Sequence, residues 1–250
     1  MKRLPLLLAA ALFLSSQAAR AQTLDIIGSA WAPYQMMEKD TPAGLGTEVI
    51  QQVIKKMGAS CTFRLIPWER CIREYERGDA DAIYLISPNP ERKKFLIFPE
   101  TPIVTSTYVF FIRKDAGKKL RFDSYRDLAG HTVGITSGYS YSPEFWEGVK
   151  SSAGVQSTST DEQNFLKLAN GRFDYFPCDV YVGADLIRKL GIEDKVTFLD
   201  KPVLRKDYFI AFCINSKFPK LPDFTSRFDS ALREFVSSQG YREIMKKYLP

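Results

Sequence analysis

The chain has 250 residues, of which 45% are hydrophobic and 26% charged, so it can fill the cores of one large domain or two small ones. Its formal net charge is +6, but Lys and Arg are scattered and often paired at expected helix ends, as in Lys55-Lys56 and Lys246-Lys247. Such pairs are typical of solvated helix faces and argue against a nucleic-acid partner.

The first 21 residues have the pattern of a secretory signal peptide. A basic start, Lys2-Arg3, precedes the short apolar run Leu6–Leu14, and Ala19-Arg20-Ala21 has the small residues of a signal peptidase site. An apolar run of about nine residues is too short for a bilayer core, which needs about 20. We therefore predict a signal peptide over 1–21, cleavage after Ala21 and export to the periplasm.

Apolar runs and helical patterns alternate through the first third of the mature chain. Strands are predicted at Leu24–Ser29, Cys61–Ile66 and Ala82–Ile86. Between them, helical spacing runs from Val49 to a stop at Gly58, and a second helix covers Trp68–Arg77. This β-α-β-α-β order predicts a parallel sheet with helices on its faces.

A long strand at 106–114 leads into a second α/β series, and a second long strand leads out of it. The expected elements are strands at Thr132–Thr136, Phe173–Phe176 and Val196–Leu199, helices opened by Ser142-Pro143 and by Thr160, a helix over Val180–Leu190, a long strand at Tyr208–Asn215, and two final helices carrying Phe224–Phe235 and Tyr241–Tyr248.

These patterns predict an α/β protein of two lobes. One lobe comprises residues 23–108 plus 212–250 and the other residues 109–211, with a hinge where the two long strands run side by side. Ligands of open parallel sheets bind outside the carboxyl ends of the strands. Two such edges that face each other form a cleft, and closing it around a small solute excludes water and strengthens polar contacts.

The four cysteines, Cys61, Cys71, Cys178 and Cys213, fit no zinc-site spacing, and we expect no metal and no cofactor. In an oxidising compartment they could form two disulfides, and the three possible pairings stay open.

The chain resembles family 3 of the bacterial extracellular solute-binding proteins, over essentially its whole mature length. The motifs that carry the resemblance are Trp31-Ala32-Pro33-Tyr34, Gly44–Glu48, Gly78–Ala82, Pro90–Phe95 with Phe98, Asp127–Gly130 with Val133-Gly134, Leu168–Asp174 and the helix Gly240–Tyr248. The resemblance implies a type II periplasmic-binding-protein fold with two crossing strands between the lobes. It also implies a polar amino acid or a related ligand, and an ABC permease in the inner membrane as partner. The oligomeric state stays open, and a monomer is the simplest expectation.

The resemblance assigns Arg92 to the ligand carboxylate, which a planar guanidinium can bind with two hydrogen bonds. The alternative for Arg92 is a surface side chain in a charged run with Lys93 and Lys94. Ser87 would offer its hydroxyl to the same carboxylate. Ser140, in a turn with Tyr139, would add a backbone N–H near a helix N-terminus, or would be a plain turn residue.

Further candidates are the aromatic residues Trp31 and Tyr34, which match positions that pack on the ligand side chain, and Trp68, which is expected to face the same space; all three could instead belong to the core. Asp179 matches the acid that pairs with a ligand ammonium, and it could also cap the following helix. Arg70 would be a second positive group or a solvated helix residue.

Two positions depart from the family pattern, so the ligand need not be a standard α-amino acid. Asn89, which with Tyr139 is also a candidate ligand contact, stands where the family usually has Thr and is flanked by two prolines. Leu85 replaces a small polar residue.

The main competing class is an enzyme, because some proteins of this fold are periplasmic dehydratases of prephenate-like acids. Glu38, Glu144 and Asp179 are candidate acids, but the spacing singles out none of them as catalytic. The chain has no G-x-S-x-G, H-E-x-x-H or P-loop pattern, so we expect a binding protein and no enzyme. A ligand-sensing module for a membrane receptor stays open.

Overall fold

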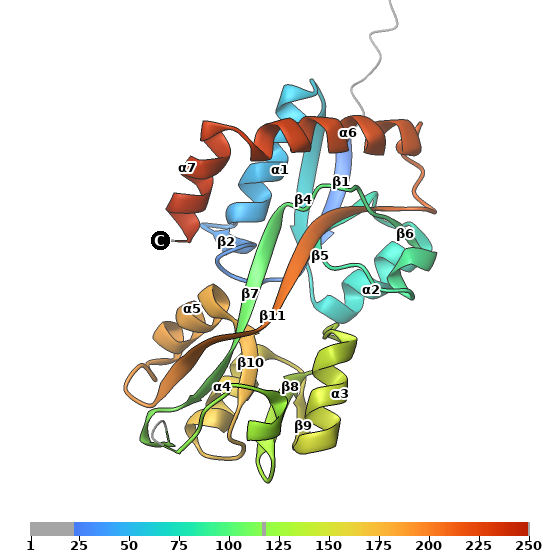
Figure 1. Ribbon diagram of the computed structural model, residues 1–250. Helices are drawn as coiled ribbons and strands as arrows, with labels where there is room; N and C mark the ends of the chain where they lie inside the picture. The colour runs from blue at the N-terminus through green and yellow to red at the C-terminus, as the bar shows by residue number, and fades with distance from the viewer. Residues whose placement is uncertain (1–22, 117–118, 250) are drawn as a thin grey trace, which may run out of the picture.

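The computed structural model describes residues 23–116 and 119–249, so the predicted signal peptide lies outside the described residues. Two lobes lie one above the other, and two long strands cross between them (Figure 1). The upper lobe contains the parallel strands β1 (Thr23–Gly28), β4 (Ser60–Leu65) and β5 (Ala82–Ile86), with β1 between the other two. Helices α1 (Leu45–Lys56) and α2 (Trp68–Arg77) connect them, as the alternating pattern predicted.

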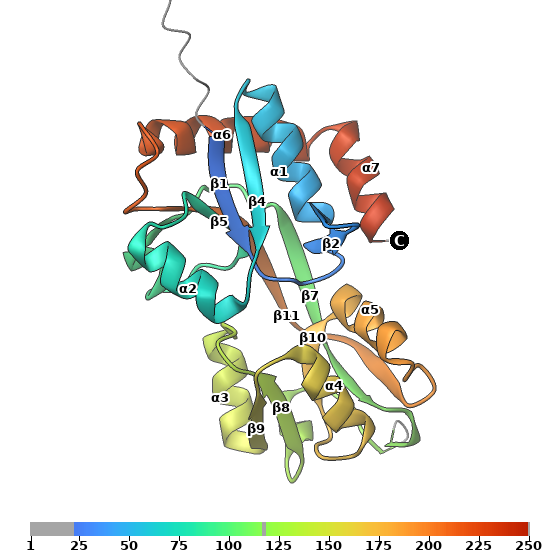
Figure 2. The same cartoon turned by 180° about the vertical axis from the view of Figure 1, so that it is seen from behind.

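The C-terminal helices α6 (Leu221–Val236) and α7 (Gln239–Tyr248) return to the upper lobe and pack against α1 (Figure 2). Their apolar stripe includes Phe224, Phe228 and Leu232, which join the core. This lobe also holds a hairpin of β2 (Met36–Glu38) and β3 (Thr41–Ala43), the short strand β6 (Leu96–Ile97) and the 3-10 helix η1 (Arg92–Lys94).

The lower lobe is built from a second set of strands and helices (Figure 1). Strands β8 (Thr132–Thr136) and β9 (Gly154–Thr158) pair in parallel, and Tyr175 bridges Val133. Around them lie β10 (Phe176–Asp179), the helices α3 (Pro143–Ser152), α4 (Asp161–Ala169) and α5 (Val180–Leu190), and the 3-10 helices η2 (Lys114–Ala116) and η3 (Tyr125–Leu128).

Two antiparallel strands, β7 (Val104–Arg113) and β11 (Val196–Cys213), connect the lobes. They join both lobes into one strand order, β10-β7-β11-β5-β1-β4. In β11, residues from Val196 to Tyr208 pair with β7, and Phe209 to Phe212 then pair with β5. The crossing strands therefore carry residues into the space where the lobes face each other.

Three expectations about strands differ from the structure. The strand predicted at Phe173–Phe176 lies at Phe176–Asp179 instead. It contains Pro177, which is tolerated at the edge of a sheet, and β10 ends the strand order. The strands predicted separately at Val196–Leu199 and Tyr208–Asn215 are one strand of 18 residues. The middle of this strand is polar and mostly exposed, and its pairing with β7 is irregular near Pro202. A hydropathy pattern therefore does not indicate that the two apolar segments belong to one strand.

The four cysteines all have free thiols, and Cys71, Cys178 and Cys213 are buried. Within residues 23–116 and 119–249, no helix is both long enough and apolar enough to cross a membrane.

Candidate ligand-binding site

A cavity of about 480 Å³, including its open mouth, lies where the two lobes face each other. From the upper lobe it is lined by residues that follow strand ends, among them Ser29, Trp31 and Ser87, and by Trp68 at the start of α2. Tyr139 and Ser140 follow β8 in the lower lobe, while Lys206 and Tyr208 come from the crossing strand β11. The cavity is thus at the facing strand ends, where the two-lobe arrangement predicted a cleft.

A bulge in β5 aims the end of this strand at the cavity. Leu85 has a φ of +54°, and the pairing of β5 with β11 shifts register beside it, between Phe209 and Ile210. Successive residues of a regular strand face opposite sides, but here Leu85, Ile86 and Ser87 all line the cavity. A left-handed Leu costs about 1–2 kcal/mol, and the surrounding packing must offset this.

Arg92 lies at the start of η1, with its guanidinium in the cavity wall. Its Nη1 donates to the carbonyl and hydroxyl oxygens of Ser87 at 2.8 and 3.0 Å, and its Nη2 lies 3.4 Å from the Gly138 carbonyl of the lower lobe. The guanidinium also lies over the Trp68 ring, 5.1 Å from its centroid. Burial lowers the pKa of Arg92, and in the described part of the chain no carboxylate forms an ion pair with it.

Asn89 lies behind Arg92 rather than in the cavity wall. Its side-chain oxygen accepts a hydrogen bond from the Arg92 backbone N–H at 2.7 Å, and its own carbonyl accepts from Lys93. Asn89 therefore positions the turn that carries the guanidinium.

Trp31 forms part of the cavity wall, whereas Tyr34 lies behind it. The centroid of the Trp31 ring lies 4.7 Å from that of Tyr34 and 4.6 Å from that of Tyr208. The Tyr34 side chain is buried, with 1% of its surface exposed. The Tyr34 hydroxyl donates to Asp179 of the lower lobe at 3.0 Å. This pair is a direct hydrogen bond between the lobes.

Asp179 is fully buried and is not among the residues that line the cavity. One carboxylate oxygen accepts the Tyr34 and Ser106 hydroxyls, and the other accepts the backbone N–H groups of Tyr181 and Val182, which makes Asp179 the N-cap of α5. Burial raises the pKa of Asp179 despite these donors. The helix-capping role is therefore present, whereas contact with a ligand ammonium stays a prediction.

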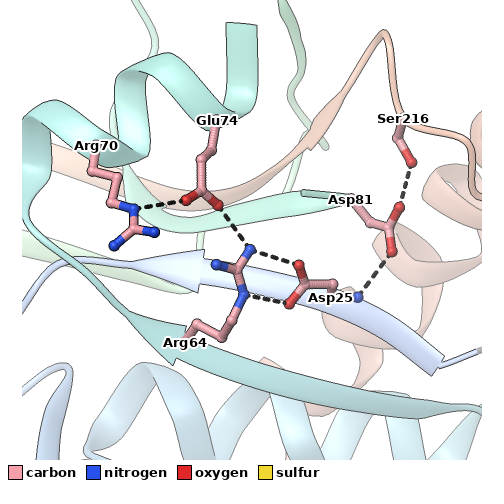
Figure 3. A network of polar contacts seen from close by, with 6 residues as sticks. All are labelled: Asp25, Arg64, Arg70, Glu74, Asp81 and Ser216. Atoms are coloured by element: carbon pink, nitrogen blue, oxygen red, sulfur yellow. Dashed lines mark hydrogen bonds and ion pairs between the residues drawn. The ribbon is translucent and has the colours of Figure 1, made fainter. Parts of the chain in front are cut away.

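Arg70 belongs to a polar network on α2 and the sheet, away from the cavity (Figure 3). Its Nε donates to Glu74 at 3.1 Å, and its side chain is 59% exposed. Glu74 in turn accepts from Arg64, which also binds Asp25 through two hydrogen bonds. Of the ten predicted residues, the cavity brings together six, which are Trp31, Trp68, Ser87, Arg92, Tyr139 and Ser140.

The sequence interpretation did not include Lys206, Tyr208 and Gln35, which also line the cavity. The Lys206 ammonium donates to the Ser140 carbonyl and lies 5.6 Å from the centroid of the Tyr208 ring. Burial, with a contribution from the charge of Arg92, lowers the pKa of Lys206 to about 7. The only signal that could have found Lys206 is its place on the crossing strand, four residues after Pro202.

Three polar atoms of the cavity residues are buried without a hydrogen-bond partner in residues 23–116 and 119–249. They are the indole nitrogens of Trp31 and Trp68 and the side-chain oxygen of Gln35. These atoms have almost no access to solvent, and two of them lie against glycines, Trp68 Nε1 beside Gly138 and the Gln35 oxygen beside Gly28, so they lie behind the open space of the cavity.

Residues 26–250 match the family described as bacterial extracellular solute-binding proteins, family 3, and the chain belongs to this family. The arginine-binding periplasmic protein of Mannheimia haemolytica is 26% identical over 237 residues, which cover 92% of this chain and 92% of that protein.

Two solved structures show the same fold at low identity. One is an ancestral amino acid-binding protein described as a precursor of cyclohexadienyl dehydratase, with a TM-score of 0.72, 21% identity and coverage of 91% of this chain and 96% of that one. The other is a histidine kinase sensor domain with similarity to periplasmic binding proteins, with a TM-score of 0.73, 20% identity and coverage of 92% and 97%. The predicted type II two-lobed fold is confirmed.

Proposed function

We propose that the protein captures a small carboxylate-bearing solute, an amino acid or a related metabolite, in the crevice between its lobes. The observation that carries this proposal is the buried guanidinium of Arg92. Its Nη1 is held by Ser87, while its Nη2 lies at a long 3.4 Å from the Gly138 carbonyl. A carboxylate can therefore replace that weak contact with a charge-assisted hydrogen bond.

Closure of the lobes would accompany binding. The proposed halves are residues 23–108 plus 212–250 and residues 109–211, with the hinge in β7 and β11. Arg92 from one half and Ser140 from the other line the same cavity, so a bound solute would contact both halves. Each charge-assisted hydrogen bond contributes roughly 1.5–3 kcal/mol, and micromolar affinity requires about 8 kcal/mol.

The setting we propose is the periplasm, with the signal peptide removed and an ABC permease of the inner membrane receiving the solute from a monomeric binding protein. Family membership and the arginine-binding relative support this setting. The cavity wall, within the described residues, contains no Asp or Glu to act as a general acid. This composition favours binding over the dehydration of prephenate-like acids.

The test is Arg92→Ala in a thermal-shift screen of amino acids, opines, polyamines and small organic acids, followed by calorimetry. We expect a carboxylate-bearing hit with the wild-type protein and a loss of its stabilisation in the variant, while the unliganded melting temperature changes little. Arg73→Ala, which removes an exposed arginine of α2, is the matched control and should keep the full ligand-induced shift. Undiminished stabilisation of Arg92→Ala would contradict the proposal.

A further inference from the structure

The side chains of the cavity wall carry two positive charges, Arg92 and Lys206. Among residues 23–116 and 119–249, no Asp or Glu lines the same wall. Anions need donors and ammonium groups need acceptors, so this wall is suited to a ligand with an excess of negative charge.

The carbonyl oxygens nearest to the cations are already used. Ser87 and Gly138 accept from Arg92, and Ser140 accepts from Lys206. These neutral partners leave both positive charges without a counter-ion within residues 23–116 and 119–249. Arg92 is buried and Lys206 is half-buried, so a positive charge without a paired anion is costly here, and the two cations in one small cavity also repel each other.

The acid that would receive a ligand ammonium is separated from the cavity. Asp179 is 0% exposed, and its two oxygens accept four donors from Tyr34, Ser106, Tyr181 and Val182. A cationic ligand such as arginine would meet two cations and, among the described residues that line the cavity, no carboxylate.

We propose that the solute carries two acidic groups, one bound by Arg92 and Ser87 and the second bound by Lys206. This inference rests on the proposed function and names the ligand class of the same site. A small dicarboxylate is the simplest such ligand.

The experiment compares matched ligands by calorimetry at pH 6.5. The probes are a dicarboxylate series from malonate to adipate, the monoamide of the tightest binder, glutamine and arginine. The monoamide keeps the shape of the dicarboxylate but lacks one charge. We expect the tightest dicarboxylate to bind at least tenfold more strongly than its monoamide, and arginine to bind more weakly than either.

The variants separate the role of Lys206 from a general effect of charge. Lys206→Met should weaken dicarboxylate binding at least tenfold and change monoamide binding less than twofold, and Lys206→Arg should restore most of the dicarboxylate affinity. Arg205→Met removes one charge from the exposed neighbour on the same strand and should change neither ligand. Melting curves establish that each variant is folded.

The outcomes distinguish the two proposals. Tighter binding of arginine or glutamine than of every dicarboxylate would overturn the two-acid inference but leave the proposed carboxylate site standing. Equal losses of dicarboxylate and monoamide affinity in Lys206→Met would have the same consequence. Binding of no carboxylate of any kind would overturn the proposed function itself, and the inference with it.

Discussion

Two cations lie in the cavity wall with aromatic rings and carbonyl oxygens as partners: Arg92, which is buried, and Lys206, which is half-buried. The Arg92 guanidinium lies over Trp68 and the Lys206 ammonium lies near the face of Tyr208. Such cation–π contacts contribute about 0.5–2 kcal/mol, which offsets part of the cost of removing a charge from water. Burial nevertheless lowers the pKa of both groups.

The lowered pKa of Lys206 predicts that dicarboxylate affinity decreases as the pH rises. Lys206 has a pKa near 7 in the unliganded protein, and a second carboxylate binds its protonated form. Above pH 7 the site must take up a proton on binding, so affinity should fall by up to about tenfold per pH unit until the pKa of the complex is reached. Calorimetry between pH 6.5 and 9 measures the slope.

The control for the pH dependence is Lys206→Met, which should remove most of the slope. The other groups near Lys206 do not change charge in the same way. Arg92 stays protonated, and burial raises the pKa of Tyr139 and Tyr208 above that of a free phenol. Asp161, behind Tyr139, has a pKa raised to about 6 by burial, and its effect would be retained in the variant. Equal slopes in both proteins would contradict the prediction.

The resemblance to the family, rather than spacing alone, indicates Arg92 and Ser87, and both line the cavity. The sequence could not separate the two roles of Asp179, since an N-cap and an ammonium partner use the same residue type at the same helix start. The sequence analysis did not identify Lys206 because it is one of many lysines. Its contact with Ser140 depends on where the crossing strand β11 passes the turn after β8, and these segments are distant in the chain.

At the scale of elements, α5 packs against β7 through a contact that only glycine allows. A Cβ added at Gly183 would lie 2.1 Å from the Phe111 ring, and Phe111 is fully buried. Although alanine favours a helix by up to about 1 kcal/mol, we expect Gly183→Ala to destabilise the protein by about 1–3 kcal/mol through overpacking. Chemical denaturation provides the measurement.

Gly240 of α7 is the matched control for Gly183. Its added Cβ would lie 3.4 Å from Phe235, an ordinary contact. Gly240→Ala should therefore be neutral or stabilise the protein by up to about 1 kcal/mol. A loss of stability in Gly240→Ala as large as in Gly183→Ala would contradict the packing argument.

Elements with strong local signals could be located closely from sequence. The helices α2 and α5 and the strands β5 and β8 have the predicted bounds, because buried apolar runs and glycine stops mark their ends. The hairpin β2–β3 and the strand β9 carry no such signal, since most of their residues are exposed or only half-buried. The edge position of β10 and the continuity of β11 depend on tertiary packing, so local sequence patterns do not predict them.

For the whole molecule, the hydrogen bond from Tyr34 to Asp179 connects the lobes beside the cavity. Removing the hydroxyl should favour open arrangements, because a hydrogen bond to a charged group contributes about 1.5–3 kcal/mol. We expect Tyr34→Phe to increase the radius of gyration of the unliganded protein in small-angle X-ray scattering. Ligand affinity should fall about 3- to 30-fold, since less of the protein is in the binding-competent form.

Tyr241→Phe is the comparison variant for Tyr34→Phe, because the Tyr241 hydroxyl donates to the Ile103 carbonyl at 2.8 Å far from the cavity. It loses one hydroxyl of the same kind, and its radius of gyration and ligand affinity should stay at the wild-type values. Identical scattering curves for all three proteins would show that the Tyr34 hydroxyl does not hold the lobes together.

Both ends of the described chain lie in the upper lobe, since β1 begins there and α7 ends there (Figure 1). The lower lobe is a single uninterrupted stretch of chain between β7 and β11, whereas the upper sheet is complete only when Phe209 to Phe212 pair with β5. During vectorial synthesis or export from the N-terminus, the lower lobe therefore has all of its residues before the upper one does. The half that holds Arg92 would be the last to fold, and the solute site would form only when the last part of the chain arrives.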